Sequence, residues 1–356
     1  MRRLLCKVKS LENHMAKAHK KSQAQTRKQR FIRYFKKIVP IIGILILIYL
    51  VIDIGVEKII ATFLKISPIY VVIAAALTFP RLLIRNTQWQ LLLKKQKVQV
   101  SFAKSLKIFL IGYFYGSVTP GYLGQMIRIP YMKDATKEPL GKLFVNSTIE
   151  TAVHGMSLYI MMLIGAFLVV DQYPEIFFGA CVFVGTSILI YAFFIKKERG
   201  EKTFQFLIKL FIPKRFTFHM DKFVNTFYND FPRIRDYILP FLLGIPAWII
   251  IYSQIYILGI SLDIEVPYFL FLVLYPIANI IAFIPISAAG LGTREAALVF
   301  LFSLYGVAPE KAIVLSLAGH LLTDVLTGFY GFIISLTESR NNKNMSEFEQ
   351  FIESSN

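Results

Sequence analysis

Cysteine and acidic residues are scarce in this 356-residue sequence. Its two cysteines lie apart, Cys6 in a basic N-terminal stretch and Cys181 inside an apolar run, so a disulfide framework is excluded. Aspartate and glutamate number 22 against 40 lysines and arginines. Long stretches lack charge of either sign, 55% of the residues are hydrophobic and the mean hydropathy is +0.56. These values exceed what a soluble core of this size needs and indicate an all-α, polytopic membrane protein.

The basic residues, which give a net charge of +18, lie in the N-terminal stretch and between apolar runs. Residues 1–37 contain thirteen Lys or Arg and one acid, 94–107 contain five Lys and no acid, and 196–236 contain ten basic and five acidic residues. This pattern fits the positive-inside rule and contact with anionic lipids, and it argues against a nucleic-acid partner. We therefore expect a multi-pass protein of the plasma membrane with a cytoplasmic N-terminus.

The apolar segments predict about six full spans plus two hairpins, or eight or more spans. The expected domains are a basic cytosolic tail (1–37), a transmembrane domain (38–337) and a polar C-terminal tail (338–356). Within the transmembrane domain, about 196–237 interleaves Phe with Lys and Arg, which is typical of an amphipathic segment on an anionic membrane surface. The apolar segments lie at about 38–56, 69–93, 106–118, 143–170, 176–195, 238–260, 267–284, 291–306 and 311–337.

Basic connections should face the cytoplasm, and connections that contain only acids, at 171–175 and 261–266, should face outward. Counting the membrane crossings between them predicts two hairpins. Residues 106–142 must start and finish inside, and the return limb has too few residues to span, so we expect a re-entrant hairpin with its tip at TPGYLG. Residues 267–306 must start and finish outside, either as a deep hairpin or as two short spans. The order span, hairpin, span in 69–170 then recurs in 238–337 with opposite orientation. Such an inverted repeat is the architecture of alternating-access transporters.

Both predicted tips combine a helix break with small residues and a following arginine. Proline removes a backbone donor and glycine permits positive φ, so a helix can end within the membrane and a new one can present its positive N-terminus to an anion. An arginine adds a bidentate partner for phosphate. We therefore predict that both tips bind substrate. Pro120 and Pro285 are the expected helix breakers, and the predicted binding residues are Gly121, Gly124 and Arg128 in the first tip and Gly290, Gly292, Arg294 and Glu295 in the second. The alternative is that the two arginines lie at the membrane interface, or that Glu295 neutralises Arg294.

The long segments after the tips carry polar pairs at i,i+4 spacing, Glu150 with His154 and His320 with Asp324. This spacing places both members on one helix face. The pairs are predicted to line the same cavity as a headgroup contact or proton relay, while hydrogen bonding within each pair is the simpler alternative. A metal site is not supported by any recognised ligand spacing.

Arg81 and Arg85 share a helix face toward the cytoplasmic end of the segment 69–93. Long cationic side chains near a span end commonly reach out to lipid headgroups, which is the favoured interpretation of both residues. The alternative is that they line the entrance to the predicted cavity.

Three stretches, TPGYLGQMIRIPYM, NSTIETAVHG and ISAAGLGTREAALVFLFSLYGV, resemble the flippase-like membrane family that includes the transmembrane region of lysylphosphatidylglycerol synthases and archaeal AglD-like proteins. The likeness covers about 40–337, and the G-x-G-x-R-E motif from Gly290 to Glu295 is its most specific part. The resemblance implies translocation of a modified phospholipid or glycolipid headgroup. Departures from the family pattern concern the substrate: Tyr122 and Gln125 stand where Arg and Glu are usual, and Thr151 and His154 where Arg and Asp are usual.

We therefore predict a lipid flippase, without enzymatic activity, metal or cofactor, that moves an anionic phospholipid or glycolipid headgroup through a cationic cavity. A lipid-modifying enzyme is a candidate partner. One alternative is a membrane-bound transferase of aminoacyl or glycosyl groups, or its accessory subunit, although the longest polar connection is short for a donor-binding domain. The other is an ion-coupled transporter of a small soluble anion, which would share the same architecture.

Overall fold

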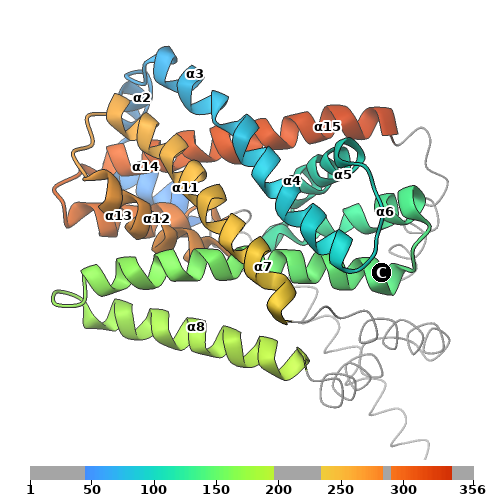
Figure 1. Cartoon of the computed structure of the whole chain (residues 1–356). Helices are drawn as coiled ribbons and strands as arrows, with labels where there is room; N and C mark the ends of the chain where they lie inside the picture. The colour runs from blue at the N-terminus through green and yellow to red at the C-terminus, as the bar shows by residue number, and fades with distance from the viewer. Residues whose placement is uncertain (1–44, 196–233, 284–289, 339–356) are drawn as a thin grey trace, which may run out of the picture.

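The computed structural model describes residues 45–195, 234–283 and 290–338, and this part of the chain consists of helices and short connections, without a strand (Figure 1). The fold class is therefore as predicted. The two terminal tails, most of the amphipathic segment 196–237 and Pro285 lie outside the described residues.

Five helical stretches are long and apolar enough to cross a membrane: Pro68–Lys95, Leu140–Leu168, Pro174–Phe193, Arg235–Ser261 and Pro309–Thr337. Shorter helices connect them. In chain order the elements are Leu45–Ile54, α2 (Val56–Phe63), α3 (Pro68–Ala76), α4 (Thr78–Lys95), α5 (Phe102–Ser117), the 3-10 helix η1 (Pro120–Ile127), α6 (Arg128–Thr136), α7 (Leu140–Leu168), α8 (Pro174–Ile195), η3 (Ile234–Tyr237), α11 (Ile238–Ser261), α12 (Tyr268–Phe283), α13 (Thr293–Ser303), α14 (Pro309–His320), the π-helix η5 (Leu321–Val325) and α15 (Leu326–Glu338).

Proline and serine set several helix starts. Pro68 and Pro309 occupy the first turns of α3 and α14, where the missing N–H costs nothing. Ser101 caps α5 by accepting a hydrogen bond from the backbone N of Lys104 at 3.3 Å. The chain therefore fixes these starts locally, whatever packs around them.

The two short-helix hairpins occupy opposite sides of the bundle, α5, η1 and α6 on one and α12 and α13 on the other, with α4 and α11 packed together between them (Figure 1). We call α3 to α7 the first half and α11 to α15 the second half. Each hairpin packs on the last long helix of the other half, α5 on α15 and α12 on α7. Reciprocal packing of this kind is what two structurally repeated halves would produce. The inversion of one half relative to the other stays a prediction.

Two glycines allow these crossed contacts. A Cβ on Gly165 of α7 would lie 1.9 Å from the carbonyl oxygen of Val273 in α12, and a Cβ on Gly331 of α15 would lie 2.0 Å from that of Leu110 in α5. Both distances are far below van der Waals contact, so only glycine fits. Small residues at helix crossings are the usual means of close approach between membrane helices.

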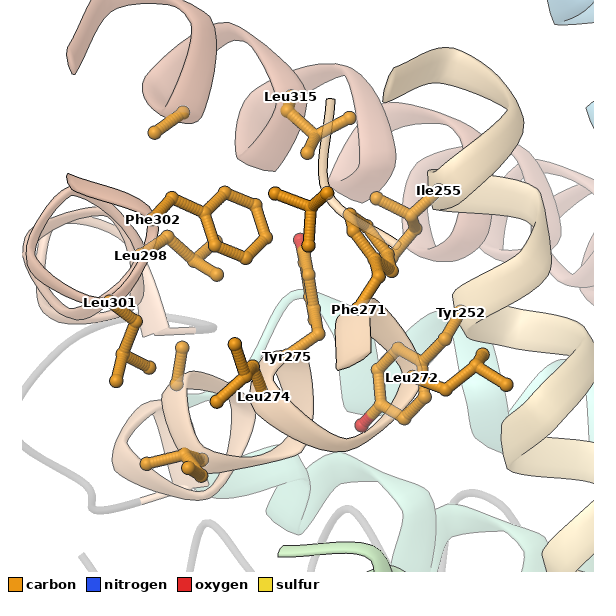
Figure 2. Packing of buried hydrophobic residues seen from close by; sticks show 14 of the residues in the cluster. Tyr252, Ile255, Phe271, Leu272, Leu274, Tyr275, Leu298, Leu301, Phe302 and Leu315 are labelled. Atoms are coloured by element: carbon orange, nitrogen blue, oxygen red, sulfur yellow. The ribbon is translucent and has the colours of Figure 1, made fainter. Parts of the chain in front are cut away.

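An aromatic and aliphatic core fills the space where α12 and α13 meet α11 and α14 (Figure 2). Phe271, Tyr275 and Phe302 pack ring against ring, with centroids 5.4 to 6.4 Å apart. Leu298 and Leu315 are fully buried beside them. A second cluster around Trp89, Ile108 and Tyr131 holds α4, α5 and α6 together. These two cores fix the hairpins on the long helices and so position the polar centre between them.

Candidate functional site

A cavity of about 350 Å³ lies among helices of both halves. Its polar walls come from α4, α5, η1, α7, α11, α12, α13, α14 and η5, and α8 adds two aromatic side chains. The polar and aromatic lining residues include Arg81, Arg85, Tyr113, Tyr122, Gln125, His154, Trp248, Tyr252, Tyr275, Asn279, Arg294, His320, Thr323 and Asp324.

The first tip forms where α5 ends at Ser117 and a 3-10 helix begins at Pro120. A Cβ on Gly124 would lie 2.0 Å from the carbonyl oxygen of Tyr115, so the tip packs directly on the α5 backbone. The backbone N of Gly124 donates to Thr119 Oγ1 at 2.7 Å, which satisfies one donor freed by the break. Gly121 lies within the same 3-10 helix. The predicted helix break at this tip is confirmed.

Arg128, the first residue of α6, is buried and paired within the protein. Its Nη2 lies 2.7 Å from Glu150 Oε2, and its Nε donates to Ser147 Oγ at 3.1 Å. Arg85 Nη2 lies 2.7 Å from the other oxygen of Glu150, and Arg85 also donates to Gln88. Both oxygens of Glu150 are therefore occupied by guanidinium groups. Arg128 and Glu150 are not among the residues that line the cavity.

The second tip ends in two left-handed glycines, Gly290 with φ 77° and Gly292 with φ 86°, before α13 starts at Thr293. This backbone conformation requires glycine and confirms an interrupted helix. Glu295 Oε2 accepts a hydrogen bond from the Gly292 backbone N at 2.5 Å and so caps α13. The two glycines and Glu295 shape the tip without lining the cavity.

Arg294 of the second tip does line the cavity. Its Nη2 lies 3.2 Å from Glu295 Oε1, and its Nε donates to Ser316 Oγ of α14 at 2.9 Å. The contact of Nε with a serine on the following long helix repeats that of Arg128 with Ser147. The two tips therefore share a local arrangement, but only the second exposes its arginine to the cavity.

Arg81 stands at the middle of the 28-residue span Pro68–Lys95, not near its end, and is 2% exposed. Its Nη2 donates to the Thr323 carbonyl oxygen at 3.0 Å and to Thr327 Oγ1 at 2.6 Å. Its Nε has no hydrogen-bond partner, and no described carboxylate forms an ion pair with it. Our interpretation of Arg81 and Arg85 as headgroup-reaching side chains is therefore wrong, because both are buried and line the cavity.

Asp324 connects the two halves. It lies in the π-helix η5 at the middle of the last span, and such π segments often occur at functional sites. Asp324 Oδ1 accepts from the hydroxyls of Tyr113 at 2.7 Å and Tyr122 at 3.2 Å, both from the first half. Asp324 Oδ2 lies 3.0 Å from His320 Nδ1 and 3.1 Å from Thr323 Oγ1. The predicted pairing of His320 with Asp324 is confirmed.

His154 is held in one orientation at the cavity wall. Its ring stacks on Trp248 with centroids 4.5 Å apart, and Trp248 Nε1 donates to the His154 carbonyl oxygen at 2.9 Å. His154 Nδ1 is buried without a hydrogen-bond partner. The predicted bond between Glu150 and His154 does not form, because Glu150 turns to Arg85 and Arg128 instead.

The structure thus gathers four of the predicted site residues around the cavity: Arg294, His154, His320 and Asp324. Whether they bind substrate stays a prediction. Tyr113 and Trp248 were missed because each looks like an ordinary member of an apolar span, whereas Asn279 was missed although a lone amide in an apolar helix could have marked it. In the described part of the chain, no three His, Cys, Asp or Glu side chains gather closely enough to hold a metal ion.

The buried charged residues of the described chain all belong to this centre. Four are arginines and three are acids: Arg81, Arg85, Arg128, Arg294, Glu150, Glu295 and Asp324. One positive charge therefore remains in excess when both histidines are neutral. Because a buried charge without a counter-ion is costly, the arrangement is suited to bind an anion.

Comparison with known proteins agrees with a membrane protein. A UPF0104 membrane protein of Methanocaldococcus jannaschii is 24% identical over 85% of this chain and 95% of the relative. UPF0104 membrane proteins of Pyrococcus horikoshii and Methanothermobacter thermautotrophicus are each 20% identical, over 85% and 80% of this chain and 96% and 90% of the relatives. The family described as lysylphosphatidylglycerol synthase TM region matches residues 38–331. The chain is therefore a multi-pass membrane protein that belongs to the family of the lysylphosphatidylglycerol synthase TM region.

Proposed function

We propose that this protein is a flippase that moves the anionic headgroup of a phospholipid or glycolipid across the bilayer. The observation that carries the proposal is the uncompensated positive charge of the cavity. Arg81 is buried at the middle of a span with an unused Nε and no acidic partner among the described residues. Charged residues at this depth usually face a substrate pathway.

Both halves of the protein contribute cations to this cavity. Arg81 and Arg85 come from α4 in the first half, and Arg294 comes from α13 in the second. A binding site at the boundary between two halves, next to interrupted helices, is what alternating access requires. Relative motion of the halves would then open the site to one leaflet at a time.

One wall of the cavity supports a lipid rather than a soluble anion. Tyr159, Phe183, Tyr191 and Ile251 line it and are half-buried, in contrast to the buried arginines. Two of them lie on α8, which packs against α7. A ligand with a polar head and an apolar tail fits a cavity that is cationic on one side and aromatic on the other.

Reconstitution tests the proposal directly. The purified protein is placed in liposomes that carry a fluorescent phosphatidylglycerol, and a membrane-impermeant quencher reports the lipid left in the outer leaflet. We expect Arg294→Ala to slow lipid movement by at least about tenfold, which is about 1.4 kcal/mol in activation free energy. Lys94→Gln removes the same charge from an exposed position on α4 and should move lipid at the wild-type rate.

Two other results would contradict the proposal. Formation of a modified lipid from an added aminoacyl or glycosyl donor would establish a transferase. Uptake of a labelled soluble anion without movement of lipid would establish an anion transporter. A thermal unfolding curve close to that of the wild type must accompany the Arg294→Ala result, so that loss of movement is not loss of folding.

A further inference from the structure

We infer that His320 binds a proton when the cavity binds an anionic headgroup, so that lipid movement is coupled to proton movement. The inference rests on the proposed function for the ligand and its movement. It adds a second ligand, the proton, and with it an energy source. It follows from the way His320 is held beside Asp324 at the cavity wall and from the charges that surround this pair.

His320 and Asp324 pair in the middle of the last span. His320 ends α14 and Asp324 lies one turn later in η5, with His320 Nδ1 3.0 Å from Asp324 Oδ2. The other oxygen, Oδ1, accepts from the hydroxyl of Tyr113 at 2.7 Å. An ionised carboxylate only accepts hydrogen bonds, so the neutral ring carries its hydrogen on Nδ1 and keeps its lone pair on Nε2. A carboxylate in this position orients the ring and stabilises the imidazolium that forms when Nε2 takes up a proton.

Nε2 of His320 is open to the cavity. The side chain lines the cavity and is 12% exposed. Nε2 forms no hydrogen bond within the described part of the chain, and it is not among the polar atoms there that are buried without a partner. A proton can therefore reach it from whichever side of the membrane the cavity faces.

His154, the other histidine of the lining, lacks these features. Its Nδ1 is buried without a partner, and its ring stacks on Trp248. The acid one turn before it, Glu150, pairs with Arg85 and Arg128 instead. An imidazolium at His154 would thus have no carboxylate beside it. The cavity therefore offers a matched control for His320 in the same lining.

The charges that act on a proton at His320 are of both signs. Asp324 favours the proton, whereas Arg294 and Arg81, which donates to the carbonyl oxygen of Thr323, oppose it. The helices α2, α3 and α15 also pack on α14 or η5, but they contribute no residue to the cavity lining. The charged and titratable groups that face the pair are Arg81 of α4, Tyr113 of α5, Tyr122 of η1, Tyr252 of α11 and Arg294 of α13.

An anion in the cavity changes this balance. With the cavity empty, an imidazolium adds a second positive charge to a centre that already has one in excess. A bound anionic headgroup compensates the first charge and attracts the second at short range. Anion binding therefore favours proton binding, and because coupling between two sites is reciprocal, acidic conditions favour anion binding. The proton passes from water to Nε2 on the acidic side and returns to water on the other.

Proton uptake on lipid binding tests the inference in the wild-type protein. Phosphatidylglycerol is titrated into the full-length protein in neutral detergent at about pH 6.5, where an unperturbed imidazole is half protonated. Calorimetry in two buffers that differ in ionisation enthalpy gives the number of protons taken up, and the lipid phosphodiester does not titrate near this pH. We expect uptake of up to about one proton per lipid, and an affinity at least about fivefold higher near pH 5 than near pH 8. No uptake over this pH range would overturn the inference.

Substitution of each histidine identifies the proton acceptor. In His320→Gln the amide keeps a donor for Asp324 but binds no proton, so uptake should be lost and the affinity should no longer depend on pH. His154→Gln should keep the uptake, whatever its effect on affinity. Uptake retained in His320→Gln, or lost in a folded His154→Gln, would overturn the assignment. Thermal unfolding checks the folding of each variant, and His320→Asn replaces His320→Gln if that variant does not fold.

Transport separates this inference from the proposed function. In liposomes with a pH difference of about one unit, one-to-one coupling should concentrate a trace of labelled phosphatidylglycerol up to about tenfold in the leaflet that faces the alkaline side. Protein-free liposomes and liposomes with His320→Gln give the distribution without coupling. If the protein moves lipid but the distribution matches these controls, the flippase proposal holds and the coupling fails. If binding takes up a proton but no lipid moves, the proton site holds, and the flippase proposal fails together with the coupled movement that rests on it.

Discussion

The two halves of the protein build similar centres around a tip arginine and then use them differently. In the first half, Arg128 donates its Nε to Ser147 and pairs with Glu150. In the second half, Arg294 donates its Nε to Ser316 and pairs with Glu295. Arg294 lines the cavity and Arg128 does not. The arginine, serine and glutamate contacts therefore mainly hold helices together in the first half. In the second half, the same contacts present a positive charge to the cavity.

The position of the acid explains this difference. Glu150 stands on the long helix α7, opposite the tip, so it draws Arg128 toward α7 and away from the cavity, and it also pairs with Arg85, which lines the cavity. Glu295 stands next to Arg294 in α13, so the pair stays at the tip. Arg81 then supplies the cavity with an unpaired cation from the first half.

The sharpest test of this comparison is removal of each acid. Glu150→Gln leaves two buried guanidinium groups without a counter-ion, and we expect it to lower the free energy of unfolding by about 3 to 5 kcal/mol. Glu295→Gln should cost less, because one guanidinium loses its partner and that group faces the cavity. Denaturant titration of the purified proteins in detergent measures both.

The control for this pair is Glu138→Gln. Glu138 lies 3.0 Å from Lys142 in an i,i+4 pair, with its side chain 25% exposed, and such pairs contribute about 0.3 to 0.5 kcal/mol. If Glu295→Gln proves as costly as Glu150→Gln, the two centres are equally structural and the proposed division of roles is wrong.

Much of this architecture can be read from the sequence. The two helix breaks follow from local chemistry, proline and glycine at 120–124 and glycine at 290–292, so no tertiary information is needed. The long apolar segments and the intramembrane charges are equally visible. Arg294, His320 and Asp324 could be assigned to one centre because polar groups within spans tend to face the protein interior.

The pairings could not be predicted, since they join distant parts of the chain. Asp324 accepts from Tyr113 and Tyr122, which are 211 and 202 residues away in sequence. Glu150 turns from the nearby His154 to two arginines on other helices. The inward direction of Arg81 could not be predicted either, because its partners Thr323 and Thr327 are 242 and 246 residues away in sequence.

The crossed helix contacts offer a second test of the likeness between the halves. Gly165→Ala and Gly331→Ala would each press a methyl group into a carbonyl oxygen of the opposing hairpin. We expect each to cost about 1 to 3 kcal/mol of unfolding free energy, and by similar amounts, because overpacking forces the backbone to shift. Thermal and denaturant unfolding in detergent measure the effect.

Two glycines of α8 provide the control. A Cβ on Gly179 or Gly185 would meet nothing within 4 Å, so Gly179→Ala and Gly185→Ala should be neutral or stabilising by up to about 1 kcal/mol through helix propensity. A large loss at only one of Gly165 and Gly331 would show that the two crossings are not equivalent.

The smallest expected effects come from removing the hydrogen bonds that Tyr113 and Tyr122 of the first half donate to Asp324 of the second. Tyr113→Phe removes a 2.7 Å bond to Asp324 and should lower the free energy of unfolding by about 1 kcal/mol, a typical net value for one hydrogen bond. Tyr122→Phe removes a 3.2 Å bond and should cost less. Tyr330→Phe, at a 44% exposed position on α15, serves as the control.

The two tyrosine bonds to Asp324 join the halves, whereas Glu150 is held by arginines of its own half. Tyr113→Phe and Tyr122→Phe should therefore also change the rate of lipid movement. Unchanged rates in both, together with unchanged stability, would mean that Asp324 does not connect the halves and that the contrast with Glu150 has no functional consequence.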